Sequence, residues 1–353
     1  MPPIDLPEPA DRIEPFCPYF GTCGGCTLQH FGPPSYMALK QEMVESALRN
    51  AHVETVVKPL IEAHGDGRRR ATLHARGKAV GYMKARSHDL LDITTCPILV
   101  PALASRAPAM ARPIAATIGD CDVAFTATDT GLDVAVQTER KLKPEKLTLL
   151  AQRLQLARMS LNGEIVLQAR APAIRMGKAL VELPISSFLQ ATAMAEATLS
   201  RLVLDGVGSA KSVADLFCGL GPLTLRLAET ARMFAADADK SAIVALQNAV
   251  KHTQGLKPVT AMMRDLFREP LVAIELKIYD AVVFDPPRAG AEAQCRELAK
   301  STVKTVVAVS CEPKTFARDA AILLAGGYRL ESVTPVDQFA WSMHVEVVGV
   351  FRR

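Results

Sequence analysis

Several features that would place this 353-residue chain in a simple class are missing from it. It has no uninterrupted apolar run long enough to span a membrane. Its proline-rich, acidic N-terminus, MPPIDLPEPADRIEPF, lacks the basic-then-apolar order of a secretion signal. The formal net charge of +4 is too small to indicate a nucleic-acid partner by itself. These absences predict a cytoplasmic protein without a membrane partner.

The second half of the chain alternates apolar runs with amphipathic ones. From about residue 186, strand candidates cover 212–217, 233–237, 259–263, 279–285 and 305–310, with helical segments between them. This alternation predicts βαβ units, a parallel sheet, and ligands at the carboxyl ends of the strands. The last two strand candidates, YRLESVT and HVEVVGVF, have no helix between them. We therefore expect a terminal hairpin with one antiparallel strand.

The first half has a different pattern. SYMALKQEMVESALRN is typical of an amphipathic helix, and residues 121–138 predict two strands around an Asp-Thr-Gly turn. Between these, residues 64–88 carry one acid, Asp66, and seven basic residues: Arg68, Arg69, Arg70, Arg76, Lys78, Lys84 and Arg86. This stretch suits either an RNA-binding hairpin or the solvated face of a hairpin.

The eight cysteines are unevenly distributed. Cys17, Cys23 and Cys26 lie within ten residues, and Cys96 is the next along the chain. A long cytoplasmic chain seldom uses disulfides, so a tight cluster indicates metal or redox chemistry. Zinc sites usually pair two C-x2-C elements, and this sequence has only one such spacing among these residues. The spacing therefore favours an iron–sulfur cluster over zinc.

The stretch DLFCGLGPLTLRLA, residues 215–228, joins a strand to a helix through a glycine-bearing turn. Such a turn lets a ligand approach the backbone at a helix N-terminus, although it is not the G-x-G-x-x-G dinucleotide motif. The next strand ends in Asp237 and the third is followed by Asp265. Acids in these places can be helix caps, but their recurrence after three strands favours a cofactor that contains a nucleoside.

Three further stretches place reactive groups at strand ends. VVFDPPRAG holds Asp285 against two prolines, which fix the backbone in an extended form, and Arg288 follows. In VVAVSCEPKTFARD, Cys311 ends an apolar run, whereas a structural cysteine would be expected inside it. In MHVEVVGVF, Glu346 lies on an apolar strand, where a carboxylate is costly without a partner or a task. A buried salt bridge and a catalytic role both explain Glu346 at this point.

Taken in order, DLFCGLG, DPPRAG, SCEPKTFARD and HVE resemble the motifs of RNA 5-methyluridine methyltransferases that depend on S-adenosylmethionine, in particular the 23S rRNA uracil-C5 type. SSFLQ (186–190) is similar to the family's aromatic-x-glutamine element. C-x5-C-G-G-C together with Cys96 is similar to its [4Fe–4S] motif. The resemblance spans almost the whole chain and is weakest over residues 100–180.

The resemblance implies an α/β fold with three parts. Residues 186–353 would form a Rossmann-like class I methyltransferase domain with a mostly parallel seven-stranded sheet. Residues 1–100 would carry the iron–sulfur cluster and the basic RNA-contacting region, and residues 101–185 a central α+β region. Only 16 residues precede Cys17, so the N-terminal β-barrel domain of many members is expected to be missing or trimmed.

The resemblance also implies a mechanism, because carbon 5 of uracil is a poor nucleophile. A thiolate added to carbon 6 makes an enolate that attacks the methyl sulfonium, and a base then removes the proton on carbon 5. By match to the motifs, Cys311 is the nucleophile, Glu346 the base, and Asp285 orients the uracil edge near the cofactor. The target uridine must leave the RNA stack, and Phe188 would stack on it.

The remaining site residues are carried over by the same resemblance. The S-adenosylmethionine site would comprise Gln190, Asp215, Phe217, Gly219, Gly221, Asp237, Asp265 and Asp285. The RNA-contacting residues would be Phe188, Arg68, Arg69, Arg70 and Arg288. The [4Fe–4S] ligands would be Cys17, Cys23, Cys26 and Cys96, with a folding or RNA-docking role, because methyl transfer moves no electrons.

The sequence departs from the family pattern at a few positions, and it leaves alternatives open. Pro222 stands where Asn is frequent, and Ala340 and Ser342 replace the usual Pro and Thr before HVE. We expect a monomeric enzyme that acts on structured RNA, with 23S rRNA favoured over tRNA. The alternatives are a DNA or protein amino-methyltransferase that uses the DPP motif, which would not need Cys311, and a non-catalytic RNA-binding iron–sulfur protein.

Overall fold

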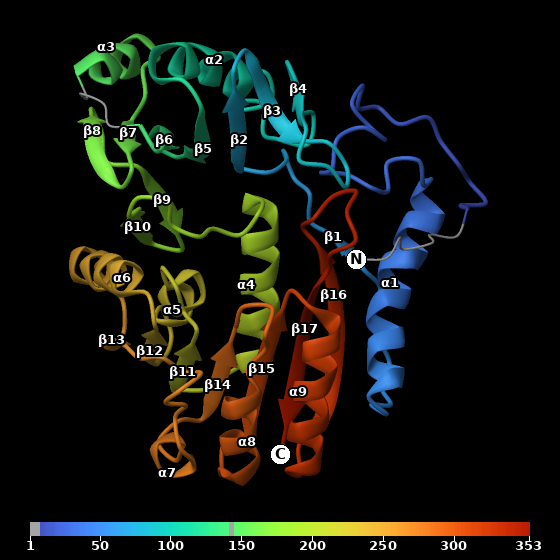
Figure 1. Ribbon diagram of the computed structural model, residues 1–353. Coiled ribbons are helices and arrows are strands. Elements are labelled where there is room, and N and C mark those ends of the chain that lie inside the picture. Colours follow the sequence, from blue (N-terminus) through green and yellow to red (C-terminus); the bar gives the residue numbers. More distant parts are fainter. Residues whose placement is uncertain (1–7, 141–144) are drawn as a thin grey trace.

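The computed structural model describes residues 8–140 and 145–353. Residues 1–7 of the proline-rich N-terminal stretch lie outside the described part. Figure 1 shows two sheets, one built mainly from the C-terminal half and one from residues 70–168, each covered by helices. None of the helices in the described ranges is long and apolar enough to cross a membrane.

The larger sheet has the strand order β1-β16-β17-β15-β14-β11-β12-β13 in the described residues. Its strands are β1 (Ile61–Glu62), β11 (Ser212–Leu216), β12 (Arg232–Asp237), β13 (Val259–Met263), β14 (Ala281–Phe284), β15 (Thr305–Ser310), β16 (Arg329–Asp337) and β17 (Glu346–Arg352). The seven strands expected from residues 186–353 are present. The eighth, β1, corrects the predicted count: this two-residue strand from the N-terminal half pairs with the otherwise open edge of β16.

The strand directions confirm the mostly parallel sheet and the terminal hairpin. Strands β11, β12, β13, β14 and β15 run parallel to one another, whereas β17 is antiparallel to both β15 and β16. The strand order reverses between β11 and β14. In doubly wound sheets, ligands bind in the crevice at the carboxyl ends of the strands beside such a reversal.

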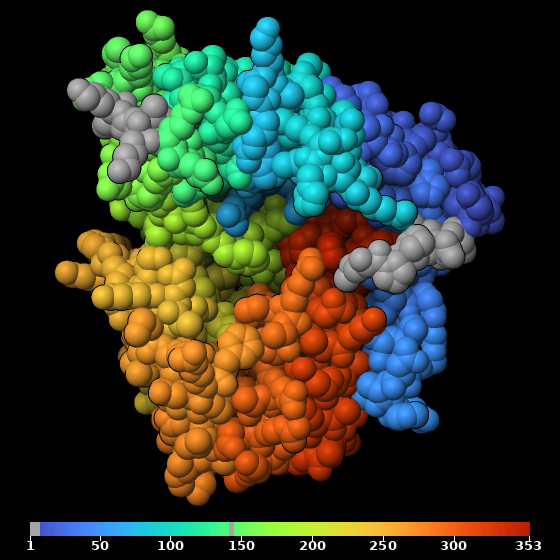
Figure 2. All heavy atoms as spheres, in the orientation of Figure 1, coloured from blue at the N-terminus to red at the C-terminus, as the bar shows by residue number. Residues whose placement is uncertain are grey.

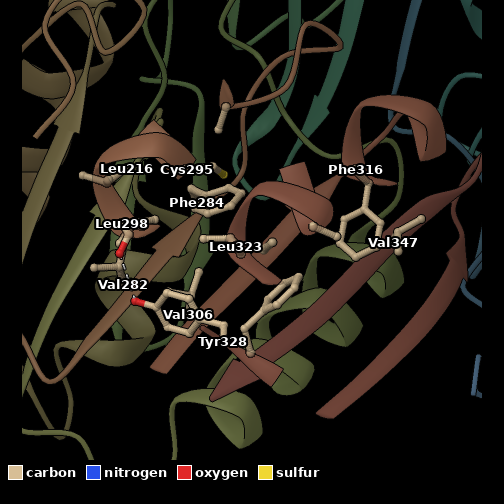
Figure 3. Packing of buried hydrophobic residues seen from close by; sticks show 14 of the residues in the cluster. Leu216, Val282, Phe284, Cys295, Leu298, Val306, Phe316, Leu323, Tyr328 and Val347 are labelled. Atoms are coloured by element: carbon tan, nitrogen blue, oxygen red, sulfur yellow. Dashed lines mark hydrogen bonds between the residues drawn. The ribbon is translucent and has the colours of Figure 1, made fainter. Parts of the chain in front are cut away.

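Helices bury both faces of this sheet, which explains the continuous apolar runs in its strands. Helices α1 (Pro33–Asn50), α7 (Ala273–Leu276), α8 (Glu292–Lys300) and α9 (Pro313–Ala325) pack on one face, as Figure 3 shows for α8 and α9. Helices α4 (Ala193–Val207) and α5 (Pro222–Leu227) pack on the other. Along β15, Val306 faces the first cluster and Val307 the second, as the two-residue period of a strand requires.

The second sheet has the order β4-β3-β2-β5-β6-β7-β8. Its strands are β2 (Arg70–Arg76), β3 (Ala79–Met83), β4 (Leu90–Asp92), β5 (Cys121–Thr128), β6 (Gly131–Gln137), β7 (Arg158–Leu161) and β8 (Glu164–Gln168). Helices α2 (Arg106–Ile118) and α3 (Glu145–Arg153) pack against it. The basic stretch pairs with the 121–137 hairpin through β2 and β5. This sheet therefore joins residues from both sides of the boundary expected at residue 100.

Two further segments pack against the larger sheet and its helices. The hairpin of β9 (Ala173–Met176) and β10 (Ala179–Glu182) packs against α6 (Lys240–His252). Helix α1 places Val44 and Leu48 in the core of the larger sheet. Its Lys40 is fully buried and donates to the Asp337 carboxylate at 2.9 Å. Part of the range expected as the iron–sulfur region thus packs on the larger sheet, and the division into domains stays a prediction.

Candidate active site

The predicted reactive groups converge at one edge of the larger sheet. Asp237 ends β12, Asp285 follows β14 and Cys311 follows β15. Because these strands are parallel, their carboxyl ends meet at the same edge, next to the reversal of strand order. In Figure 2 the surface is hollowed between the upper part of the molecule, formed by the second sheet, and the orange and red C-terminal residues.

The register between β15 and β17 brings Cys311 beside Glu346. Ser310, the last residue of β15, pairs with Val347 of the antiparallel β17. Cys311 follows Ser310 and Glu346 precedes Val347, so the two residues are neighbours at the same end of the two strands. Burial, followed by the charges of Glu346 and Asp285, raises the pKa of the half-buried Cys311 thiol to about 11, and Arg288 opposes this shift.

Glu346 is buried, with 3% of its surface exposed. Its Oε1 accepts a hydrogen bond from Gln338 Nε2 at 2.7 Å, and its Oε2 has no hydrogen-bond partner among the described residues. Burial, followed by the charge of Asp285, raises the pKa of Glu346 to about 8. A carboxyl group with one tethered and one unpartnered oxygen, and with a pKa near neutrality, is suited to act as a general base. No cation pairs with Glu346 in the described part of the chain, so the salt-bridge interpretation receives no support.

Asp285 is tied to the aromatic-x-glutamine element. Gln190 Nε2 donates to Asp285 Oδ2 at 2.9 Å. Burial raises the pKa of Asp285 to about 6, and the hydrogen bond from Gln190 opposes this shift. Two elements that lie 95 residues apart in the sequence thus meet at the edge of the sheet.

Gln338 is a residue that the sequence motifs did not identify. It is 1% exposed and follows β16. Its Nε2 donates to Gln190 Oε1 and to Glu346 Oε1, both at 2.7 Å. The only sequence signal was its place, a polar residue at the end of the apolar strand that precedes FAWSMHVE.

The turn between β11 and α5 has the geometry of a cofactor loop. Gly219 and Gly221 both adopt positive φ, and a Cβ on Gly221 would lie 2.5 Å from Leu246 Cδ1. The Gly219 N–H donates to Asp237 Oδ2 at 2.8 Å, which fixes that carboxylate at the loop. Phe217 also has positive φ, and its ring lies 5.3 Å from the ring of Phe267 between centroids.

Two of the acids predicted for the cofactor site have structural partners. Asp215 is buried and its Oδ2 accepts from the Thr224 hydroxyl at 2.5 Å, which couples β11 to the first turn of α5. Burial raises the pKa of Asp215 to about 7. Asp265 Oδ1 accepts from the backbone N–H of Phe267 at 3.1 Å and stays partly exposed. Asp215 therefore holds the end of β11 to the start of α5, and Asp265 caps a turn. Their contact with the cofactor stays a prediction.

The residues predicted to contact RNA fall into two groups. Phe188 is 73% exposed, and the exposed Arg288 donates toward His344 Nε2 at 3.2 Å. Arg69, by contrast, is buried: it donates to Glu196 Oε2 at 2.6 Å and to the Gln190 carbonyl at 2.9 Å. The expectation that Arg69 contacts RNA is therefore corrected, because its guanidinium holds α4 to the second sheet.

The four cysteines of the predicted cluster line one cavity of about 320 Å³, together with Arg68, Arg70 and Tyr82. All four are free thiols of intermediate exposure. Cys96 is distant from the other three cysteines in the sequence, yet it lines the same cavity. Nevertheless, in the part of the chain that the structure describes, no group of three or more His, Cys, Asp or Glu side chains is arranged to hold a metal ion.

Comparisons with known proteins agree with this geometry. A family model described as tRNA (Uracil-5-)-methyltransferase matches residues 139–353. An uncharacterized RNA methyltransferase of Brucella suis is 46% identical, over 97% of this chain and 85% of its own length. The 23S rRNA (uracil(1939)-C(5))-methyltransferase RlmD of Pseudomonas syringae is 32% identical, over 96% of this chain and 80% of its own length.

A solved structure shows the same fold. The tRNA (uracil-54, C5)-methyltransferase of Pyrococcus abyssi, in complex with S-adenosyl-L-homocysteine, superposes with a TM-score of 0.78 at 21% identity, covering 93% of this chain and 85% of its own. This likeness confirms the Rossmann-like methyltransferase fold. Together with the family model and the relatives in sequence, it confirms the family that the motifs predicted: the chain belongs to the tRNA (uracil-5-)-methyltransferase family, whose members are S-adenosylmethionine-dependent enzymes.

Proposed function

We propose that this chain transfers a methyl group from S-adenosylmethionine to carbon 5 of a specific uridine in 23S rRNA, through a covalent adduct with Cys311. The observation that carries the proposal is the placement of Cys311 beside Glu346 by the register of β15 and β17, next to Asp285 at the cofactor edge of the sheet. An amino-methyltransferase needs neither a thiol nor a separate base at this position.

In the proposed reaction, Cys311 acts as the nucleophile and Glu346 as the base. The Cys311 thiolate forms a bond to carbon 6 of the uracil, which makes carbon 5 nucleophilic. S-adenosylmethionine, when bound, supplies the electrophilic methyl group. Glu346 then removes the proton from carbon 5 through its unpartnered Oε2, and the bond from carbon 6 to Cys311 Sγ breaks to restore the ring and the thiolate.

The pKa of Glu346 suits both halves of this cycle. With a pKa raised to about 8 by burial and by Asp285, the carboxyl group is largely protonated near pH 7. A neutral Glu346 does not oppose the negative charge of the neighbouring Cys311 thiolate during attack. The same group must be ionised to take the proton from carbon 5, and a pKa near neutrality keeps both forms populated.

The substrate side of the site is proposed from exposure and charge. Phe188 is placed to stack on a uracil that has left the RNA stack, because its ring is exposed and is two residues from the buried Gln190. Arg288, Arg68 and Arg70 are proposed to contact the phosphate backbone. A monomer in the cytoplasm is the proposed form, since every residue of the proposed site comes from one chain.

The choice of 23S rRNA rests on the relative whose name specifies it, which aligns with nearly the whole chain. The second candidate substrate is tRNA, which the description of the matching family specifies. Both candidates require the same chemistry at the same uracil atoms, so they differ only in the RNA that the basic surfaces accept.

We also propose that Cys17, Cys23, Cys26 and Cys96 bind a [4Fe–4S] cluster. Support comes from their gathering around one cavity and from the all-cysteine donor set, which suits iron–sulfur clusters. The cluster would tie the N-terminal segment to the second sheet and take no part in methyl transfer. Protein purified without oxygen should contain iron and sulfide in equal amounts, and a Cys26→Ser, Cys96→Ser variant should contain neither; zinc in place of iron would refute the assignment.

The function is tested by giving the purified enzyme S-adenosylmethionine with transcripts of 23S rRNA, of tRNA and, separately, a DNA duplex. We expect 5-methyluridine in the 23S transcript after nuclease digestion and mass spectrometry, and none with the Cys311→Ala variant. Methylation of tRNA alone would select the second candidate. Methylated adenine or cytosine, or full activity of Cys311→Ala, would refute the mechanism.

A further inference from the structure

The side-chain amide of Gln338 has only one possible orientation. Its Oε1 accepts a hydrogen bond from the backbone N–H of Ala191 at 2.7 Å. A backbone N–H can only donate, so the oxygen of the amide must face Ala191 and the nitrogen must face the active site. That nitrogen has two protons, and it donates one to Gln190 Oε1 and one to Glu346 Oε1.

The orientation of Gln338 determines that of Gln190. Because Gln190 Oε1 accepts from Gln338, its own Nε2 must point the other way, where it donates to Asp285 Oδ2 at 2.9 Å. The result is a directional set of hydrogen bonds that begins at the Ala191 backbone and ends at two acids, Glu346 and Asp285. Both glutamines are buried, at 1% and 7% exposure, so water does not compete for these contacts.

The backbone that carries Gln338 is itself fixed. The preceding residue, Asp337, is fully buried and accepts from Lys40 at 2.9 Å and from the Tyr36 hydroxyl at 2.5 Å. Its Oδ1 also accepts from the backbone N–H of Phe339 at 3.0 Å. Since both neighbours of Gln338 are tied to helix α1 through this carboxylate, the backbone from which the amide extends is held in place. The amide itself is held by its hydrogen bonds to Ala191, Gln190 and Glu346.

We propose that Gln338 is a positioning residue for the base: it holds Oε1 of Glu346 so that the unpartnered Oε2 faces the proton on carbon 5 of the uracil, and it links the base to the cofactor-side residue Gln190. This inference rests on the proposed function. If Gln338 served only to fill space, an apolar side chain of the same length would do equally well. A positioning role requires its amide group.

The hydrogen bond from Gln338 also influences the pH dependence of the reaction. The groups that face Glu346 are Asp285 after β14 and Cys311 after β15, with Arg288 beside them. Burial and Asp285 raise the pKa of Glu346, and the hydrogen bond from Gln338 lowers it by stabilising the ionised form. Removing that hydrogen bond should therefore raise the pKa further, so that ionised Glu346 appears only at higher pH.

The test compares Gln338→Met with a matched control, Gln294→Met. Gln294 is also fully buried, and within residues 8–140 and 145–353 its side chain bonds only to the backbone of Leu271, away from the site. The measurement is single-turnover release of tritium from RNA that contains 5-tritiated uridine, at saturating S-adenosylmethionine and over a range of pH. Thermal unfolding of each variant, recorded in parallel, reports the loss of stability.

We expect Gln338→Met to slow tritium release by about 10- to 100-fold near neutral pH, the loss that follows removal of a hydrogen bond to a charged group. The acid limb of its pH profile, that is, the range in which the rate of tritium release rises with pH, should move to higher pH. Gln294→Met should lose stability and keep the wild-type acid limb. A second variant, Gln338→Glu, retains the acceptor for Ala191 and places a carboxyl group against Glu346, so its limb should also move upward.

An acid limb that stays in place in both Gln338 variants, or one that moves equally in Gln294→Met, would overturn the inference and leave the proposed function intact. Failure of the wild-type enzyme to release tritium from any uridine-containing RNA would overturn the proposed function itself, and the inference with it. The wild-type control therefore separates the two failures.

Discussion

Replacing Glu346 with glutamine tests the proposed chemistry most directly, because it removes the base and changes little else. The glutamine carbonyl can still accept from Gln338 Nε2, as Oε1 does at 2.7 Å in the wild type. The amide nitrogen would replace Oε2, which is buried and unpartnered among the described residues. The variant should therefore fold, but it cannot accept the proton from carbon 5 of the uracil.

Glu346→Gln should slow proton removal from carbon 5 and leave the earlier attack by Cys311 intact. Loss of a general base typically slows the affected step by about 10²- to 10⁴-fold. The earlier step, attack by Cys311, should not slow, because the charge of Glu346 is one of the influences that raise the pKa of that thiol. Since the enzyme can enter the cycle and cannot finish it, methylated RNA should stay covalently bound to Cys311.

The assay is denaturing gel electrophoresis of enzyme mixed with RNA and S-adenosylmethionine, with mass spectrometry of the shifted band. Glu346→Gln should give a band in nearly stoichiometric amount, carrying one added methyl group. The double variant Cys311→Ala, Glu346→Gln should give none. Wild-type turnover by Glu346→Gln, or no adduct with this variant despite binding of both substrates, would refute the role of Glu346 as the base that releases the cysteine.

Three further predictions concern folding and binding. Lys40→Met should lower the free energy of unfolding by about 3 kcal/mol in denaturant titrations, because it leaves a buried carboxylate without its cation; a loss below about 1 kcal/mol would contradict this. Phe188→Ala should weaken RNA binding by about 1–3 kcal/mol in titrations, the usual value of a base stacked on an aromatic ring, and leave S-adenosylmethionine affinity unchanged; an equal loss of cofactor affinity would contradict the stacking role. Gly221→Ala should cost about 1–3 kcal/mol of stability and weaken cofactor binding, because its Cβ would meet Leu246. A Cβ on Gly219 would meet no atom of the described residues within 4 Å, so Gly219→Ala should cost less. Equal costs would show that backbone conformation alone decides the loss.

Much of the larger sheet was predictable from local pattern. The apolar runs at 212–217, 305–310 and their neighbours are long enough for strands and too continuous for one-sided burial, so they indicated a sheet covered on both faces. Helices α8 and α9 then followed from the amphipathic segments between them. The strand-end positions of Asp237, Asp285 and Cys311 could be read directly, because the residue that ends an apolar strand is visible in the sequence.

Other features depended on contacts between distant segments, and no local pattern contains them. Arg69 lies in a basic run and was expected at the surface, yet Glu196, 127 residues away, draws its guanidinium into the interior. Gln338 has no motif of its own, and its hydrogen bonds to Gln190 and Glu346 join residues that are far apart or separated by a turn in the sequence. The pairing of β2 with β5 likewise crosses the boundary that the family resemblance implied at residue 100.

The sequence by itself determined which residues can do the chemistry: a thiol, a carboxylate and an acid after a pair of prolines, each recognisable by its type and its place in a strand. Only the tertiary structure brings them to one place. Strand β17 inserts antiparallel between β15 and β16, so that its first residue, Glu346, meets the residue after β15, Cys311. The order and direction of the strands depend on how their apolar faces pack against the helices. This packing joins segments that are distant in the sequence, so no local pattern predicts it.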